Sequence, residues 1–226
     1  METIKISDYI LVNNHKFIIC NKPVGVPVQE DKTGDSSLLK MAEIYCKATL
    51  YPVHRIDRPA SGLVIMAKKQ DACTLLSAML QDGRIEKTYI AVTRNKPEKD
   101  ADRLVHYLIH DKKINKSIIA EKTAKQAKEA IMEYKVLGSS DNYHFLTIKL
   151  LTGRHHQIRA QLATIGCPIK GDVKYGDKRS NPDRSIHLHA WKLVFNEAVH
   201  QQVKEVIGPF PQDALWDYFK DHIITA

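Results

Sequence analysis

The sequence predicts an α+β fold with a mixed, mostly antiparallel sheet and flanking helices. Pairs of short apolar runs surround polar turns, a pattern typical of β-hairpins. Other stretches place apolar residues at the spacing of amphipathic helices, and no repeat or low-complexity tract interrupts them. The chain has 226 residues, of which 43% are hydrophobic and 27% charged, as in globular proteins. This length suits one domain or two small ones.

The first half of the chain predicts a hairpin, two helices and two further strands. Ser36 or Ser37 can cap the first helix, and Gly83 can end the second. Alternating or continuous apolar runs identify the strands. The segments are the hairpin strands 9–12 and 17–20, the helices 38–47 and 71–81, and the strands 63–67 and 87–93.

The second half predicts more strands and two helices. Gly166 can end the first of these helices, and a polar, glycine-containing turn joins two of the strands. The segments are the strands 104–109, 130–137, 143–151 and 186–195 and the helices 152–166 and 212–219. Residues 112–128 are rich in lysine and weakly patterned. We expect them to form a solvated excursion, with a loop that rides over RNA as the alternative.

Composition points to a partner that carries negative charge. The formal net charge is +8 and the sequence pI is about 9.2, which favours nucleic acid over an uncharged partner. Four widely spaced cysteines form no C-x-x-C pair, so we expect neither zinc nor disulfides and a reducing, cytoplasmic setting. No basic and apolar leader opens the chain, and no apolar run approaches the ~18 residues of a membrane helix.

The strongest candidate for a catalytic residue is a carboxylate between two arginines. Asp57 lies between Arg55 and Arg58, in a polar loop broken by Pro52 and Pro59, and a purely apolar run follows. The nearby guanidinium groups favour the charged form of a carboxylate. Asp57 should therefore be ionised, and it could act as a nucleophile or as a base. The alternative is an ordinary salt bridge at the entrance of a strand.

Two other side chains have a structural and a functional interpretation each. Lys22 lies in a loop rich in Pro and Gly, where we expect it to be exposed; contact with a phosphate is the alternative. Tyr89 alternates with Thr88 and Ile90 along a strand. It is a core residue or, if its face lines a cleft, a platform for stacking a base.

The helix expected over residues 152–166 has an unusual first turn. Arg154, His155 and His156 would stand there, where positive charge opposes the helix dipole. We interpret this turn as directed at an anion. Arg159 follows one turn after His155, either as a surface charge or as a functional group. Adjacent histidines do not have the spacing of metal ligands on a helix, and His187 and His189 lack a third ligand, so we expect no metal site.

Five motifs in order resemble the RluA-type family of pseudouridine synthases. They are H-R-I-D-R-P-A-S-G at 54–62, K-T-Y at 87–89, G-R-H-H-Q-I-R at 153–159, G-D-V-K-Y-G at 171–176 and L-H-A at 188–190. An earlier N-K-P-V-G at 21–25 also matches, and the likeness extends over about residues 9–195. The chain departs from the family pattern at Ala60, at Gln161 and at residues 196–198.

The resemblance implies a single catalytic domain over residues 1–226, without an S4 domain and with a central active-site cleft. It implies that Asp57 is the catalytic carboxylate, that Tyr89 stacks on the target base and that Arg159 pairs with Asp57. Arg55 would fill the gap left by the flipped nucleotide. Other side chains would bind RNA or shape the cleft: His54, Arg154, Lys22 and Lys174.

The expected activity is that of an RNA pseudouridine synthase, an isomerase acting on ribosomal or transfer RNA. It needs no metal and no organic cofactor, and we expect a monomer. A non-catalytic RNA-binding or assembly protein on the same scaffold is the alternative. An unrelated acid–base hydrolase would need a second catalytic carboxylate or a metal site, and the sequence suggests neither.

Overall fold

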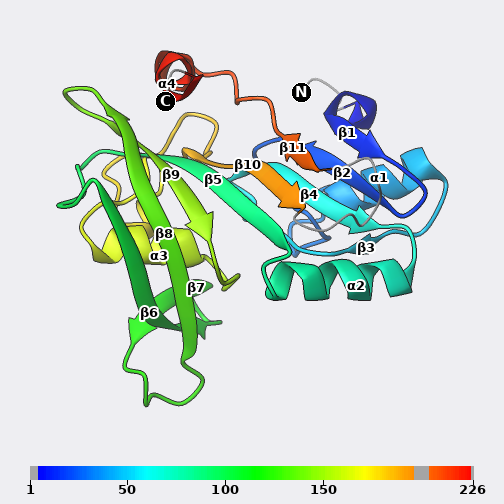
Figure 1. The fold of residues 1–226 in the computed structure, drawn as a ribbon, viewed down its shortest axis with the longest axis horizontal. Helices are drawn as coiled ribbons and strands as arrows, with labels where there is room; N and C mark the ends of the chain where they lie inside the picture. Colours follow the sequence, from blue (N-terminus) through cyan, green and yellow to red (C-terminus); the bar gives the residue numbers. More distant parts are fainter. Residues whose placement is uncertain (1–4, 196–203, 225–226) are drawn as a thin grey trace. The chain divides into compact units, whose positions relative to one another are not determined.

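The computed structural model describes residues 5–195 and 204–224. The chain divides into two compact units (Figure 1). Unit 1 comprises Met1–Glu86 and His189–Pro209, and unit 2 comprises Lys87–Leu188 and Phe210–Ala226. The departure from the family pattern at residues 196–198 lies outside the described residues.

Unit 1 is built around the buried strand β4. Its strands follow the order β1-β2-β4-β10, with β3 on β4 and β11 on β10, and only the β4–β10 pair is parallel. The strands are β1 (Ile10–Asn13), β2 (Phe17–Lys22), β3 (Tyr51–Pro52), β4 (Ser61–Ala67), β10 (Leu188–Phe195) and β11 (Glu205–Ile207). All seven residues of β4 are buried, which confirms the buried strand that the apolar run predicted.

Helices complete unit 1. They are the 3-10 helix η1 (Ile6–Tyr9), α1 (Leu38–Cys46) and α2 (Gln70–Gln81). Leu76 and Met79 of α2 join the core that includes Phe17 of β2, Ile65 of β4 and Leu193 of β10. The helix predicted over residues 71–81 is therefore confirmed, and Leu76 and Met79 face the core while Leu75 is 44% exposed.

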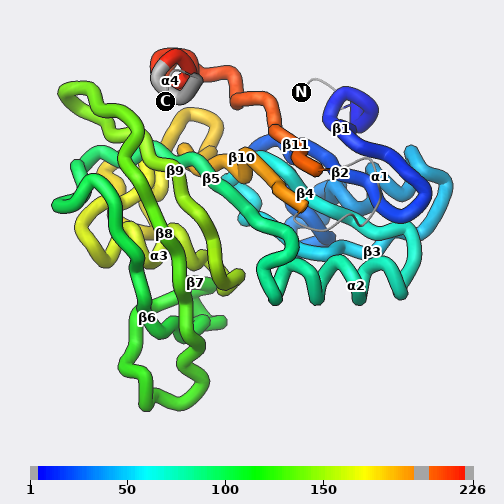
Figure 2. Tube along the Cα trace, in the orientation of Figure 1, coloured from blue at the N-terminus to red at the C-terminus, as the bar shows by residue number. Residues whose placement is uncertain are grey.

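Unit 2 is an antiparallel sheet with the order β5-β9-β8-β6-β7. Figure 2 shows β6 and β8 side by side, and in the sheet β6 lies between β8 and β7 and runs antiparallel to both. The strands are β5 (Ile85–Thr93), β6 (Ala101–Asp111), β7 (Lys116–Ala120), β8 (Lys128–Ser139) and β9 (His144–Leu150). The hairpin predicted on either side of residues 138–142 is confirmed as β8–β9.

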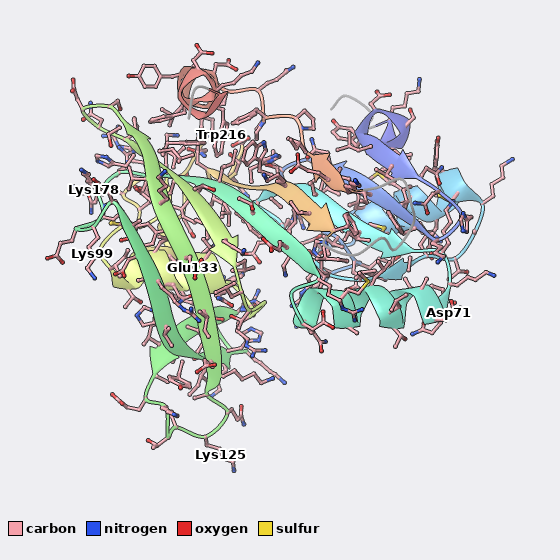
Figure 3. The ribbon with its side chains drawn as sticks, in the orientation of Figure 1. Asp71, Lys99, Lys125, Glu133, Lys178 and Trp216 are labelled. Atoms are coloured by element: carbon pink, nitrogen blue, oxygen red, sulfur yellow. The ribbon has the colours of Figure 1, made fainter. Side chains whose placement is uncertain are left out.

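Three helices accompany this sheet: α3 (Gln157–Thr164), the 3-10 helix η2 (Val173–Tyr175) and α4 (Ala214–Ile224). Ala160 of α3 packs with Leu108 of β6, Ala130 of β8 and Tyr175. On α4, Trp216 (Figure 3) meets Phe145 of β9 edge-on, with ring centroids 5.6 Å apart. The helix predicted near the end of the chain is confirmed, with its bounds shifted to Ala214–Ile224.

Two predictions about local structure were wrong. Residues 112–128 are not one solvated excursion, because Lys116–Ala120 pairs with β6 as strand β7. The helix expected from residue 152 begins only at Gln157, and His156 at its N-cap has a left-handed backbone with φ of 49°. Arg154 and His155 therefore precede the helix, and their charges do not stand in its first turn.

Candidate active site

Asp57 lies half-buried in the loop between β3 and β4 of unit 1. Backbone bonds tie this loop to β4: Val53 N–H donates to the Ile65 carbonyl at 3.1 Å. Nε2 of His54 accepts a hydrogen bond from Ile65 N–H at 3.2 Å. The loop is also closed by a bond from Ala60 N–H to the Asp57 carbonyl at 3.1 Å. The loop that carries Asp57, the candidate catalytic carboxylate, is therefore held in place by hydrogen bonds to β4 and within itself.

The strand after this loop needs glycine at its second position. Gly62 has φ of 116°, and a Cβ there would stand 2.3 Å from the Ala190 carbonyl oxygen. These two residues are partners in the parallel β4–β10 pair. Only glycine permits both the backbone conformation and the close approach. The glycine of the H-R-I-D-R-P-A-S-G motif therefore fixes the strand that anchors Asp57.

The two arginines beside Asp57 have different surroundings. Arg58 forms ion pairs with Asp31, at 3.2 Å, and with Asp35, and its Nε donates to the Gly25 carbonyl at 2.8 Å. The bond from Arg58 holds the pKa of Asp35 below its ordinary value. Arg55 is exposed, and within the described residues it makes no hydrogen bond or ion pair. Arg58 is thus held by Asp31 and Asp35, while Arg55 presents its guanidinium to solvent.

The prediction that Lys22 is exposed was wrong. Its side chain is fully buried, not exposed. Its ammonium donates to the carbonyls of Pro23 at 2.8 Å, Val26 at 2.8 Å and Arg58 at 3.1 Å. An ammonium group has three N–H donors, so these acceptors engage all of them and none is presented to an RNA phosphate. Lys22 instead joins its own loop to the residue that follows Asp57.

Burial also changes the protonation of Lys22. Desolvation lowers the pKa of Lys22 to about 7, and the nearby negative charge of Asp57 opposes that shift. Sequence reasoning missed this residue as a support of the catalytic loop. The signal was present in the N-K-P-V-G motif, but the cluster of carbonyls around the ammonium forms only in the folded chain.

Unit 2 holds the other residues singled out by the motifs. Tyr89 is a buried residue of β5, opposite Ile148 of β9. Two residues before Tyr89 on β5, burial lowers the pKa of Lys87 to about 8. Arg154 is exposed and its Nε donates to the Glu129 carbonyl at 2.8 Å. The exposed Lys174 donates to the carbonyls of the turn that precedes β7.

Arg159 forms a buried ion pair that the sequence did not predict. Its Nε lies 2.7 Å from Oδ2 of Asp172, and its Nη2 lies 2.8 Å from Oδ1. The side chains are 5% and 1% exposed, and the guanidinium carbon lies 4.9 Å from the centroid of the Tyr175 ring. The surface-charge interpretation of Arg159 is therefore wrong. Asp172 belongs to the G-D-V-K-Y-G motif, so two of the motifs meet in this bidentate pair.

The proposed site residues are thus divided between the units. Unit 1 contains Asp57, Arg55, His54 and Lys22, and unit 2 contains Tyr89, Arg154, Arg159 and Lys174. Within residues 5–195 and 204–224, no group of three or more His, Cys, Asp or Glu side chains could hold a metal ion. Chemically, Asp57 offers a nucleophile or base, and Arg55 offers a solvent-facing cation two residues away.

Comparisons with known proteins converge on one family. A family model described as RNA pseudouridylate synthase matches residues 16–164. The chain is similar to ribosomal large subunit pseudouridine synthase C of Rickettsia conorii, with 34% identity over 210 residues, 91% of this chain and 69% of that protein. The protein of the same name from Rickettsia felis is 34% identical over 198 residues, 85% of this chain and 64% of that protein.

A shorter relative and a solved structure extend this likeness. An uncharacterised RNA pseudouridine synthase of Haemophilus influenzae is 28% identical over 187 residues, 83% of this chain and 81% of that protein. The fold matches human RNA Pseudouridylate Synthase Domain Containing 4 with a TM-score of 0.76 and 21% identity, over 97% of this chain and 94% of that one. The chain therefore spans about two thirds of the two Rickettsia proteins and nearly all of this solved structure.

Proposed function

Because the chain belongs to the RNA pseudouridylate synthase family, we propose that it isomerises uridines of structured RNA to pseudouridine through Asp57. The observation that supports this most is the motif carboxylate itself, held on an ordered loop that β4 and Lys22 support. Ribosomal RNA is the first candidate substrate, since two relatives at 34% identity are named for the ribosomal large subunit. Transfer RNA is the second.

The reaction breaks the bond between N1 of uracil and C1′ of the ribose. The base then turns and forms a bond from C5 to C1′; C5 loses its proton and N1 gains one, so the composition of the nucleotide is unchanged. A folded RNA hides this bond, so the nucleotide must be extruded, at a cost of about a few kcal/mol. In our proposal Arg55 enters the gap in the RNA, and Tyr89 stacks on the extruded base. The exposure of Arg55 supports the first of these roles.

Asp57 must be ionised, whether it attacks C1′ or takes the proton from C2′. The family resemblance assigns Arg159 to this carboxylate. An arginine carries five N–H donors, so the bidentate bond to Asp172 does not by itself exhaust the group. His54 supports the loop from β4, while the exposed Arg154 and Lys174 would contact RNA phosphates.

We place this activity in the cytoplasm, in a protein that acts as a monomer without metal or organic cofactor. All four cysteines are free thiols, which suits a reducing compartment. The isomerisation transfers no electrons to or from the RNA, so it needs no redox cofactor. In the described part of the chain, no helix has the length and apolar character needed to cross a membrane.

The direct test maps pseudouridine in ribosomal and transfer RNA from cells with and without the gene. We expect one or a few sites to disappear with the gene and to return when it is restored. Identical maps in all three strains would contradict the proposal. The alternative, a non-catalytic RNA-binding protein, would leave the maps unchanged while the purified protein still bound RNA.

A further inference from the structure

Three histidine rings form a continuous stack in unit 2. The centroids of His156 and His155 lie 3.8 Å apart with an interplanar angle of 20°. The centroids of His155 and His110 also lie 3.8 Å apart, at 23°. The stack therefore joins the N-cap of α3 to the end of β6, and none of its rings is used in the proposed chemistry.

The inner end of the stack is fixed by hydrogen bonds. Tyr175 Oη donates to the Ser117 carbonyl at 3.2 Å, accepts from Ser117 N–H at 2.8 Å and lies 3.0 Å from His156 Nδ1. Ser117 Oγ donates to the His155 carbonyl at 2.5 Å and lies 3.0 Å from His155 Nδ1. A hydroxyl has one proton, so in this arrangement Nδ1 of each of the two histidines is the donor. Both rings are thereby held in one orientation.

The outer end of the stack faces solvent. His110 is exposed, and within the described residues the only ring packed on it is that of His155. Its Nε2 lies 3.1 Å from Oδ1 of Asn115, in the turn between β6 and β7. Lys174 holds the same turn by donating to the carbonyls of Ile114 at 3.3 Å and Asn115 at 3.1 Å. The exposed ring is thus pre-oriented before any ligand arrives.

The turn that follows this ring and Asp111 carries two lysines, and a third begins the next strand. Lys112 and Lys113 are exposed in the turn that follows β6. Lys116 opens β7, with its Nζ 4.9 Å from the centroid of the Tyr175 ring. A flat aromatic face beside several cations is the combination with which proteins bind unpaired nucleotides, the ring stacking on a base and the cations contacting phosphates. A metal does not explain the stack, because rings packed face to face do not converge their nitrogen atoms on one point.

We propose that an unpaired nucleobase of the RNA stacks on the exposed face of His110 and extends the three-histidine stack outward. This inference rests on the proposed function, since it takes RNA as the ligand. It assigns the base contact to His110 and the neighbouring phosphate contacts to the lysines of the β6–β7 turn. His155 and His156 act as the ordered support of the platform. Because this support already orders the His110 ring, RNA binding should cost less conformational entropy.

The test measures binding of a fluorescein-labelled, unstructured RNA of about ten nucleotides to the full chain by fluorescence anisotropy. The variants are His110→Ala, which removes the ring, and His110→Phe, which keeps a flat aromatic face. His15→Ala is the matched control, an exposed histidine in the turn between β1 and β2. A second RNA of the same length lacks its bases and keeps the sugar–phosphate backbone. Urea unfolding confirms that each variant is folded.

We expect His110→Ala to weaken binding of the intact RNA by about 5- to 150-fold. His110→Phe and His15→Ala should stay within about threefold of wild type, and the abasic RNA should bind all four proteins alike. Equal binding by His110→Ala and wild type would overturn the inference. The inference would also be overturned if His110→Phe lost as much affinity as His110→Ala, or if His110→Ala lost affinity for the abasic RNA too. Failure of the wild-type protein to bind the intact RNA would overturn it as well.

The proposed function has a separate readout, which is pseudouridine formation by the wild-type protein in total RNA. If wild type forms pseudouridine and His110→Ala binds normally, only the stacking inference fails. If wild type forms none, the proposed function fails, whatever the binding data show.

Discussion

Two arginine–aspartate pairs in this chain differ in their exposure to water. Arg58 and its partner Asp31 are 35% and 37% exposed, whereas Arg159 and Asp172 are 5% and 1% exposed. Water and salt weaken the exposed pair, so its contribution to stability should be small. The buried pair is desolvated, so removal of either partner leaves an uncompensated charge in the interior.

We therefore expect Asp172→Ala to lower the free energy of unfolding by about 3–5 kcal/mol. Asp31→Ala, the matched change at the exposed pair, should cost much less. Urea unfolding of both variants measures the difference. Equal losses in the two variants would show that the Arg159–Asp172 pair does not contribute as its burial implies.

The buried ammonium of Lys22 leads to a second residue-scale prediction. Lys22→Met leaves the carbonyls of Pro23, Val26 and Arg58 without their donor, and it should cost at least about 2 kcal/mol in urea unfolding. Lys40→Met, an exposed lysine of α1, should change stability by about 0.5 kcal/mol or less. A Lys22→Met variant as stable as Lys40→Met would contradict the assigned role.

The lowered pKa of Lys22 also sets a pH dependence. In the folded chain Lys22 loses its proton near pH 7, whereas in the unfolded chain it keeps the proton up to its ordinary pKa of 10.5. Between these values the unfolded state binds more protons, so the contribution of Lys22 to stability rises with pH. The stability difference between wild type and Lys22→Met should be larger at pH 9 than at pH 6.

Sequence reasoning located Asp57 because its chemistry is visible locally, as a carboxylate between arginines and before an apolar strand. It predicted Lys22 to be exposed, and it did not predict the burial of Arg159 or the pair that Arg159 forms with Asp172. The partners of Lys22 include the Arg58 carbonyl, 36 residues away, and the partner of Arg159 is Asp172, 13 residues away. Such contacts depend on tertiary packing, which decides whether a charged side chain is exposed or buried.

At the scale of elements, periodicity predicted the long helices and strands and failed at short or irregular ones. Strand β7 has only five residues; Ile118 and Ile119 suit a strand, but the run is too short for periodicity to identify, and its pairing with β6 appears only in the folded chain. The beginning of α3 depends on the left-handed backbone of His156, which no apolar spacing reveals. Both failures come from backbone geometry that the neighbouring structure imposes.

Capping of α1 gives the element-scale prediction. The sequence offered Ser36 or Ser37 as the cap, and in the structure Ser37 Oγ accepts from Lys40 N–H at 3.2 Å. Ser37→Ala should lower the free energy of unfolding by about 1 kcal/mol. Ser36→Ala, the adjacent exposed serine, should leave it within about 0.5 kcal/mol of wild type. Reversed effects of the two changes in thermal or urea unfolding would refute this assignment.

For the whole molecule, the net charge of +8 predicts RNA binding that weakens steeply with salt. The logarithm of affinity should fall with the logarithm of salt concentration, with a slope of about −0.7 for each phosphate contacted on single-stranded RNA. Arg154→Ala should remove about one phosphate contact and so make the slope less negative by about 0.7. Lys40→Gln should leave the slope unchanged, and a salt-independent affinity would contradict an electrostatic interface.

The central claim is that Asp57 is the catalytic carboxylate, and the most direct measurement is pseudouridine formation in total RNA by wild type and by Asp57→Asn. Asp71→Asn, an exposed carboxylate at the start of α2 (Figure 3), serves as the matched control. We expect Asp57→Asn to fold and bind RNA like wild type but to form no pseudouridine, while Asp71→Asn remains active. Turnover by Asp57→Asn above the trace expected from deamidation would contradict it.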